Sequence, residues 1–424
     1  MSRRARTLSL VLAVTLFAAL ATGREYLFNL AYLWASLLAL AFLWSWSSLR
    51  GLELVRTPRG PRAQVGRVFE ERLSLRNRSW WPKLWVEIHD ESELPDHRAS
   101  SVKLSVGRNE ERFWIVRTSC RRRGRFRIGP ARLVAGDPFG LFPRSRPAAP
   151  SYPLVVLPMT APIPSFLFPS GRLSGGEALR RRTHQVTTNA AGVRDYMPGD
   201  AFHRIHWPST VRRDRIIVKE FELDPLADVW IVLDADRNAQ AGQVEGPSPT
   251  AGRGRLVPEQ FELPPSTFEY AVAAAASLAS HFLQRDRAVG ILALGRSRVA
   301  ILPQRGDSQL FRLLETLAVV ECDGEVAFRD FLRLEGPAIP KGSTVVLITP
   351  ADDESILHSI RQLRRSGLYP VMIHLPRESF GGRPGGWDLA EAARRMSLPG
   401  YSLRCGERLE VALWERTPRP RWAA

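Results

Sequence analysis

The chain has 424 residues, enough for two or three domains that each bury a core. Its formal net charge is +17, but the arginines are spread along the whole chain, which favours codon usage in a GC-rich genome over nucleic-acid binding. An anionic membrane surface would account for part of the excess equally well. The 3 cysteines are far apart, which argues against a disulfide framework and a zinc site and suits a reducing compartment.

Two apolar runs, 7–22 and 26–46, follow each other near the N-terminus. The second is long enough to cross a hydrocarbon core of about 30 Å, and the first just reaches. Arginines flank both outer ends, so the positive-inside rule places both ends in the cytoplasm. We expect residues 1–50 to form a two-span anchor in the plasma membrane, with the soluble domains cytoplasmic. A cleaved signal peptide is the alternative.

Residues 51–142 contain short alternating segments separated by turn residues, at 69–76, 84–89, 102–106 and 113–118. This spacing predicts an all-β sandwich. The basic run 121–127 has only Phe126 as an interleaved aromatic and is predicted to be a solvated hairpin. The string DPFGLF at 137–142 is expected to close the module, and 143–191 to form a connector that begins rich in proline.

The stretch 192–236 combines a polar motif with the first strand of an α/β core. A continuous apolar run, 229–233, ends in Asp234 and Asp236, as a strand buried on both faces of a parallel sheet would. Ligands bind beyond the carboxyl ends of such strands. The motif before it supplies our candidate partner-binding residues: Arg194, Tyr196, Asp200, Arg204, His206, Trp207, Arg212, Lys219 and Glu220.

Two interpretations of this motif remain open. Arginine and tryptophan often dominate interface energies, so the motif could be a recognition surface for a partner protein. It could instead be a partly buried ion-pair lattice that fixes local geometry. In the lattice, Arg194, Arg204 and Arg212 bridge Asp195, Asp200 and Glu220. His206 is then a residue that alternates with Ile205 and Trp207 on a strand.

Alternating strands and helices continue to the end of the chain. Residues 238–265 are predicted to be a long inserted loop, and Ser266 with Glu269 forms a capping box at the start of a helix reaching about residue 284. Residues 192–424 are therefore predicted to be a doubly wound α/β domain. Its further strands are expected at 288–294, 298–302, 344–349 and 370–375, and its further helices at 308–320, 326–334, 354–366 and 389–396.

The motif resembles the bacterial family called domain of unknown function 58, through Arg194, Tyr196, Gly199-Asp200, the string at 204–207, Arg212, the string at 218–220 and a strand ending in Asp234. The Arg-Gly pair at 123–124, DPFGLF and two preceding spans match that family's layout. The resemblance implies a von Willebrand factor A-like domain in the C-terminal half. It also implies that the protein is an adaptor for MoxR-type AAA+ ATPases and transglutaminase-like membrane proteins. The family resemblance supplies no reaction.

The metal site of the von Willebrand A fold uses Asp-x-Ser-x-Ser, a Thr and an Asp after the fourth strand. Here Asp236 and Asn238 replace both serines, and Pro350 stands where the later Asp is expected. Oxygens of Asp234, Asp236 and Asn238, with Asp307 or Asp352, could hold Mg²⁺ or Ca²⁺. An ion pair between Asp236 and Arg237 competes with this reading, so we expect no cofactor.

The chain has no GxSxG, P-loop, HExxH or GxGxxG string. We therefore expect a membrane-anchored, non-enzymatic interaction protein with a degenerate von Willebrand A-like domain. The alternative is a metal-dependent enzyme using Asp234, Asp236 and His206. Membrane-proximal nucleic-acid binding is the weaker third reading.

Overall fold

A computed structural model describes residues 3–97, 99, 104–166, 190–196, 205–221, 228–242, 261–383, 385 and 387–414. The chain divides into two compact units. The first is Met1–Met159 with Pro247–Glu262 and Leu314–Val319, and the second is Thr160–Gly246, Leu263–Leu313 and Val320–Ala424.

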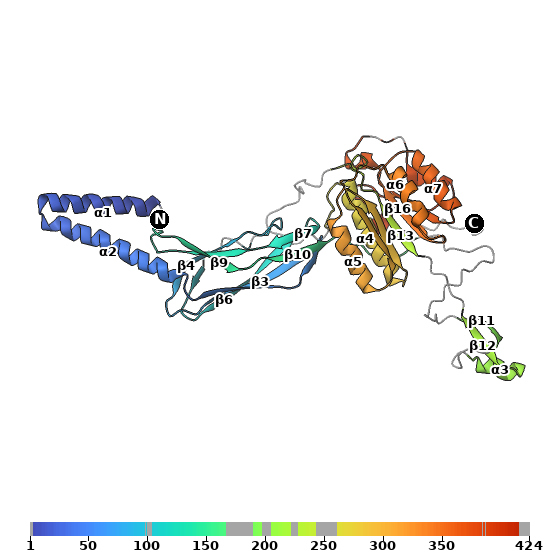
Figure 1. Cartoon of the computed structure of the whole chain (residues 1–424), viewed down its shortest axis with the longest axis horizontal. Helices are drawn as coiled ribbons and strands as arrows, with labels where there is room; N and C mark the ends of the chain where they lie inside the picture. Colours follow the sequence, from blue (N-terminus) through green and yellow to red (C-terminus); the bar gives the residue numbers. More distant parts are fainter. Residues whose placement is uncertain are drawn as a thin grey trace. The chain divides into compact units, whose positions relative to one another are not determined.

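The first unit begins with two antiparallel helices, α1 (Arg3–Thr22) and α2 (Glu25–Ser48), joined by a tight turn (Figure 1). Both are long and apolar enough to cross a membrane, and in the most apolar stretch of each helix only 11% is buried. At 1.5 Å per residue, α2 is about 36 Å long, which exceeds the hydrocarbon thickness of a bilayer. The predicted pair of apolar helices is therefore present as two candidate membrane helices.

The β-domain of the first unit follows, in three sheets. Strands β3 and β4 carry alternating buried residues, and Leu73, Leu75, Val86 and Ile88 meet in one apolar cluster. The first sheet is β1 (Leu52–Pro58), β3 (Val68–Asn77) and β6 (Glu111–Ser119). The second is β5 (Leu104–Val106), β4 (Lys83–Asp90), β8 (Ala131–Ala135) and β9 (Arg144–Ala149). The third is β2 (Arg62–Gln64), β10 (Tyr152–Leu157) and β7 (Gly124–Ile128).

The predicted end of this domain at residue 142 is wrong. Strand β9 pairs with β8, and β10 pairs with both β7 and β2, so residues to Leu157 complete the β-domain. The sequence pattern did not predict these strands, because each contains a proline. Pro147 is tolerated because β9 is an edge strand, and Pro153 lies near the start of β10.

Residues 160–166 also do not form part of a connector, because they pack within the second unit. The Ala161 N–H donates to the Ser277 hydroxyl oxygen at 2.9 Å, and the Phe166 ring stacks on Tyr401 at 4.7 Å. The remainder of the expected connector, 167–189, lies outside the described residues.

The second unit is built on a six-stranded sheet with the order β15-β14-β13-β16-β17-β18. All neighbouring strands are parallel except β15, which is antiparallel to β14. The central strands β13 and β16 are buried along their whole length, as the apolar run at 229–233 predicts. The bounds are β13 (Val229–Leu233), β14 (Val289–Leu294), β15 (Arg298–Gln304), β16 (Thr344–Thr349), β17 (Tyr369–His374) and β18 (Gly400–Ser402).

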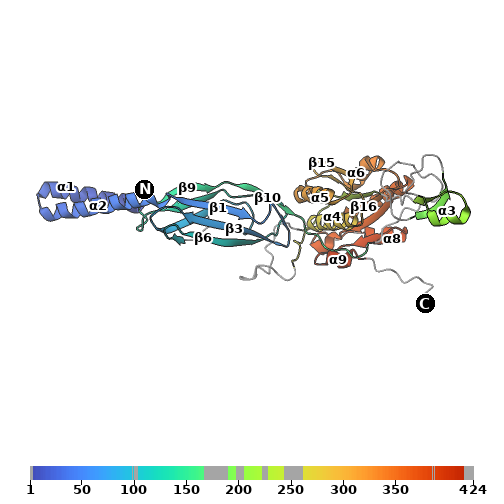
Figure 2. The ribbon, with the colours of Figure 1, turned by 90° about the horizontal axis from the view of Figure 1, so that it is seen from below.

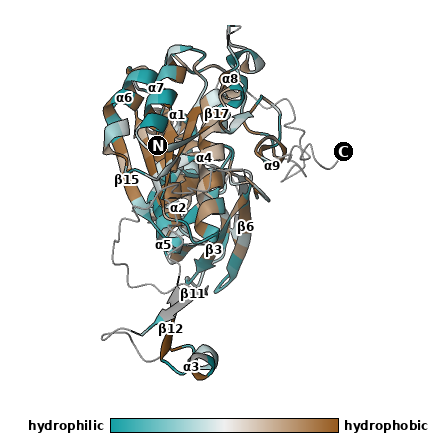
Figure 3. Cartoon of the chain, turned by 90° about the vertical axis from the view of Figure 1, so that its right-hand side faces the viewer, coloured by the Kyte–Doolittle hydropathy of each residue, from teal (hydrophilic) through white to brown (hydrophobic). Residues whose placement is uncertain are grey.

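Helices cover both faces of this sheet (Figures 1 and 2). Helix α4 (Thr267–Gln284) packs its alanine-rich surface against β13, β14 and β16. On the other face, Trp230 and Val232 of β13 join an apolar cluster with α6 (Phe328–Glu335), α7 (Ser355–Arg365) and α8 (Leu389–Arg395). Brown, hydrophobic segments accordingly lie in the interior of this unit in Figure 3.

The predicted elements from residue 266 onward are present, with small shifts at their ends and some further short elements. Strand β18 and α9 (Leu409–Ala412) were not predicted, and α5 (Asp307–Val319) begins one residue before its predicted start. Ser266 is the N-cap residue of α4, but its side chain makes no capping bond, so the expected capping box is not formed.

Candidate functional site

The polar motif forms a short hairpin of β11 (Ala190–Asp195) and β12 (Ile217–Phe221). In its antiparallel register Arg194 lies opposite Val218, and Gly192 lies opposite Glu220. Lys219 lies opposite Val193. The hairpin therefore brings three of the predicted residues together on paired strands, while the predicted Asp200 and Arg204 lie outside the described residues.

The predicted strand through Ile205, His206 and Trp207 is wrong in its second half. Ile205 does bridge to Val218, but Trp207 begins a seven-residue helix, α3 (Trp207–Arg213). Pro208 favours this because its fixed φ and missing N–H suit the first helical turn. The Thr210 hydroxyl accepts from the Ile217 N–H at 3.0 Å and so ties α3 to β12.

His206 is engaged locally. Its Nδ1 lies 2.7 Å from the Ser209 hydroxyl oxygen, and its backbone N–H donates to the Ile217 carbonyl at 2.8 Å. It is half-buried at the N-cap of α3. These contacts join the end of the strand segment to the start of the helix.

Helix α3 presents two apolar side chains to solvent. Trp207 is 64% exposed and Val211 is 81% exposed, and positions four residues apart share one side of a helix. We call these two residues the α3 face. The predicted Arg212 is also exposed and adjoins it in sequence, and beneath the helix Ile217 and Val218 are buried.

The ion pair that is described in this motif differs from those predicted. Asp195 pairs with Arg215 at 3.0 Å, and both side chains are 59% exposed. A pair this exposed contributes little to stability, about 0–1 kcal/mol. Tyr196 continues the hairpin, because its backbone N–H donates to the Ile216 carbonyl at 2.9 Å.

The carboxyl end of β13 holds a network centred on Asp234. The Thr349 hydroxyl, at the end of β16, donates to Asp234 Oδ2 at 2.5 Å, and the Asp236 N–H donates to Oδ1 at 3.0 Å. Gln240 donates its side-chain amide to the Asp234 carbonyl at 3.0 Å. Asp236 in turn accepts from both the backbone and the side-chain N–H of Asn238.

This environment opposes a charged ligand site. Burial raises the pKa of Asp234 to about 7, against an ordinary 3.8. Both of its oxygens accept bonds from the protein, and the Asn238 side chain directs its amide nitrogen to Asp236. Among the described residues no group of three or more His, Cys, Asp or Glu is placed to hold a metal ion. The residues present therefore do not fit the Mg²⁺ or Ca²⁺ of a von Willebrand A-type site.

The other proposed ligands lie elsewhere. Strand β15 runs antiparallel, with Gln304 opposite Val289, so Asp307 lies at the amino edge of the parallel strands, away from Asp234. Asp352 follows β16 at the correct edge but lines a separate pocket. The predicted pair of Asp236 with Arg237 is also wrong, because Arg237 pairs with Glu325 at 3.0 Å.

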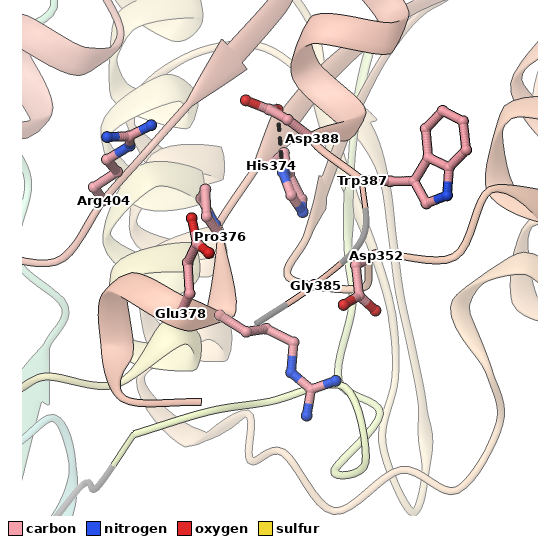
Figure 4. Close-up of a pocket in the computed structure, with 9 residues that line it drawn as sticks. Asp352, His374, Pro376, Glu378, Gly385, Trp387, Asp388 and Arg404 are labelled. Carbon is pink, nitrogen blue, oxygen red and sulfur yellow. Dashed lines mark hydrogen bonds and ion pairs between the residues drawn. The ribbon is translucent and has the colours of Figure 1, made fainter. Parts of the chain in front are cut away.

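That pocket, of ≈ 60 Å³, lies beyond the end of β17 (Figure 4). His374 is 2% exposed, and its Nδ1 lies 3.4 Å from Asp388 Oδ1. Asp388 also caps α8 by accepting the N–H groups of Ala390 and Glu391, and the bond to His374 holds its pKa at about 2. Within the described part of the chain, His374 Nε2 is buried without a hydrogen-bond partner.

Comparisons with known proteins find the expected family. Residues 192–247 match the model described as "Protein of unknown function DUF58". Over 343 residues, the chain is 23% identical to the "Uncharacterized protein YeaD" of Bacillus subtilis (strain 168). The alignment covers 78% of this chain and 77% of YeaD. The chain therefore carries a segment that matches the DUF58 family.

Two solved structures resemble the chain only distantly. An aerotolerance-related membrane protein from Bacteroides fragilis NCTC 9343 is 16% identical, with a TM-score of 0.28, covering 44% of this chain and 94% of that one. The CARDB domain of the PF1109 protein from Pyrococcus furiosus is 10% identical, with a TM-score of 0.19, covering 25% of this chain and 87% of that one. TM-scores this low do not establish a shared fold.

The matched segment, 192–247, contains α3, β12 and most of β11, and it contains Asp234 and Asp236 but not Thr349. Sequence reasoning missed the partners of Asp234, although Thr349 ends a buried strand next to β13 and was a recognisable donor. It also missed the pocket at His374. A His that ends an apolar strand, followed by an Asp that begins a helix, was the available signal.

Proposed function

We propose that this chain is a membrane-anchored, non-enzymatic interaction protein of the DUF58 family. Helices α1 and α2 cross the plasma membrane, and the β-domain, folded as a β-sandwich, carries the second unit. Both outer ends of the helix pair are flanked by arginine, which supports a cytoplasmic position for the soluble domains.

The second unit is proposed to be a degenerate von Willebrand factor A-like domain. Its central strand is followed by Asp234-Ala235-Asp236-Arg237-Asn238, where the fold carries Asp-x-Ser-x-Ser. The fourth strand of its sheet in chain order, β16, ends beside it and contributes Thr349. Hydrogen bonds within the protein replace metal ligation at this position.

The α3 face carries the interaction proposal. A tryptophan and a valine stand exposed on one side of a helix inside the family segment, with Arg212 exposed beside them. Exposed apolar residues beside arginine are typical of interface centres, where tryptophan and arginine contribute the largest energies. Covering Trp207 and Val211 in a complex would bury their apolar surface, which supports a partner at the α3 face.

The expected partner is a MoxR-type AAA+ ATPase, with a transglutaminase-like membrane protein as a second member of the assembly. This choice rests on the family resemblance. The role of the protein would then be to hold the ATPase at the membrane, with no metal, cofactor or nucleic acid required.

The test is a binding titration between the detergent-solubilised full chain and the purified MoxR-type ATPase of the same organism. Trp207→Ala combined with Val211→Ala should weaken binding at least about tenfold, as the loss of an interface hot spot does. Leu334→Ala is the matched control, because Leu334 is 69% exposed on α6. Equal affinity for wild type and both variants would contradict the proposal.

A further inference from the structure

The end of the β-domain next to α2 carries a second group of exposed aromatic side chains. Trp80 is 64% exposed and Trp81 56% exposed, and their rings make an edge contact at 5.4 Å. Phe139, in the DPFGLF string, is 57% exposed. We call these three residues the aromatic rim.

The loop that carries the two tryptophans is rigidly held. Asn77, fully buried at the end of β3, donates its side-chain amide to the Trp81 and Gly107 carbonyls, each at 2.9 Å. Its side-chain oxygen accepts from the N–H and hydroxyl of Ser79. The exposure of Trp80 and Trp81 is therefore built into the loop.

The same loop is attached to the end of α2. The Lys83 ammonium donates to the Ser47 carbonyl at 2.6 Å, and the Arg78 N–H donates to the Gly51 carbonyl at 2.7 Å. Gly51 has a positive φ of +72°, and a Cβ there would lie 2.9 Å from Ser79 Cβ, so glycine permits this close approach. Trp80 and Trp81 thus stand next to the last turn of α2.

The DPFGLF string is attached to both helices. Leu141 packs with Ala5 of α1 and Ala41 of α2, and the Phe142 ring meets Phe42 edge-on at 5.7 Å. The Ser45 hydroxyl donates to the Phe142 carbonyl at 2.5 Å. Phe139 therefore lies at the same end of the β-domain as the two tryptophans, the end at which α2 leads into β1.

We infer that the aromatic rim inserts into the headgroup region of the bilayer that α1 and α2 cross, an inference that rests on the proposed membrane anchoring. Tryptophan favours this layer because one edge of its ring is apolar and the other donates a hydrogen bond. The rim lies level with the last turn of α2, which already carries Trp46, so both reach the same depth. The rim fixes the β-domain against the membrane surface.

Basic side chains complement the anionic phosphates expected at that depth. The Arg50 guanidinium lies 3.3 Å from the Trp46 ring centroid, and that of Arg108 lies 5.5 Å from the Trp80 ring centroid. Arginine stacked on an aromatic ring keeps its N–H groups free to bind phosphate oxygens. Alternating aromatic and basic groups around one helix end match a bilayer surface better than a dry protein interface.

The experiment measures the depth of nitroxide spin labels in the full chain reconstituted into vesicles of phosphatidylcholine and phosphatidylglycerol. Cys120, Cys322 and Cys405 are first replaced by alanine, and single cysteines are then introduced as Trp80→Cys or Trp81→Cys. Leu40→Cys, at a 66% exposed position of α2, reports the membrane span. Arg59→Cys reports the aqueous end of the domain, because Arg59 follows β1 at the end remote from Asn77.

We expect the labels at 80 and 81 to lie at interfacial depth. Their collision rates with oxygen relative to a water-soluble nickel complex should fall between those of the labels at 40 and 59. The label at position 40 can lie in the hydrocarbon while the labels at 80 and 81 are as accessible to the nickel complex as the label at 59. In that case the rim stands in water, and only this inference fails. Shielding of 80 and 81 from both reagents would place the rim against a second copy of the chain and would also overturn it. An aqueous position 40 would overturn the membrane anchoring itself.

Discussion

Thr349 donates its hydroxyl hydrogen to the Asp234 carboxyl group at 2.5 Å, across 115 positions of sequence. The two residues end neighbouring central strands, β16 and β13. The second Asp234 oxygen accepts a hydrogen bond from the Asp236 N–H. The carboxyl group therefore links the ends of the two strands to the turn that follows β13. An acidic residue at a position typical of metal binding here serves as a structural link.

The first prediction is insensitivity to divalent cations. Because both Asp234 oxygens are engaged, millimolar Mg²⁺ or Ca²⁺ should leave the melting temperature of the detergent-solubilised chain unchanged. The same should hold for Asp234→Ala, although that variant melts lower than wild type. A melting temperature that Mg²⁺ raises in wild type and leaves unchanged in Asp234→Ala would contradict the degenerate-site proposal.

A second prediction concerns pH. Burial raises the pKa of Asp234 from 3.8 to about 7, so the folded state holds a proton that the unfolded chain releases. The stability from this group is full below about pH 4 and is lost as the pH rises towards 7. Asp234→Asn keeps a neutral side chain at every pH. Its melting temperature relative to wild type should therefore rise between pH 4 and pH 7 and stay constant above.

Asp388→Asn is the control with the opposite sign. The pKa of Asp388 is held at about 2, so its contribution is present above the ordinary value of 3.8 and is lost as the pH falls towards 2. This variant should be most destabilised near neutral pH. Parallel pH profiles for the two variants would show that the Asp234 carboxyl is not protonated in the folded protein.

The sequence predicted those parts of the fold in which one pattern dominates. The apolar run at 229–233 has the pattern of a buried strand, and the alternation of β3 and β4 was equally plain. Strands β9 and β10 were missed because Pro147 and Pro153 obscure the strand pattern, and their tolerance depends on sheet position. The start of α3 was misread because Ile205 to Trp207 alternates like a strand until Pro208.

The candidate site was less predictable than the fold, because its contacts join distant parts of the chain. Asp234 was identified from its place after a strand, but whether it binds a metal depends on Thr349, a residue of another strand. The exposure of Trp207 likewise depends on α3 lying over a small core that includes Ile217. Residue types indicated where the site lies, and tertiary contacts decide what each residue does there.

A third prediction tests the buried ion pair of the β-domain. Arg56 donates to both oxygens of Glu71 at 2.7 and 2.8 Å, and Tyr152 donates its hydroxyl to Glu71 at 3.0 Å. The side chains of Arg56 and Glu71 are 4% and 0% exposed. Glu71→Ala leaves a buried guanidinium without its main partner, which should cost about 3–5 kcal/mol.

Hydrogen exchange of the β1 and β3 amides measures this cost within the β-domain alone. The control is Glu70→Ala, because Glu70 pairs with Arg59 at 2.7 Å and with Arg117 at 3.0 Å at the surface, where solvent screens both pairs, so the loss should be much smaller. Comparable losses of protection in the two variants would contradict the argument from burial.

The last prediction concerns Asp137, which organises the DPFGLF string. Its buried carboxylate accepts the N–H groups of Phe139, Leu141 and Phe142 at 3.0, 3.1 and 2.6 Å. Asp137→Ala leaves these donors without their acceptor, and a bond to a charged group contributes about 1.5–3 kcal/mol. Hydrogen exchange across 138–142 should accelerate at least about tenfold. The packing of Leu141 and Phe142 on α1 and α2 should loosen in the same variant. The control is Glu53→Ala, which removes only an exposed pair with Arg78 and should leave this loop protected. Unchanged exchange in Asp137→Ala would mean that packing on the helices, and not the carboxylate, holds the loop in place.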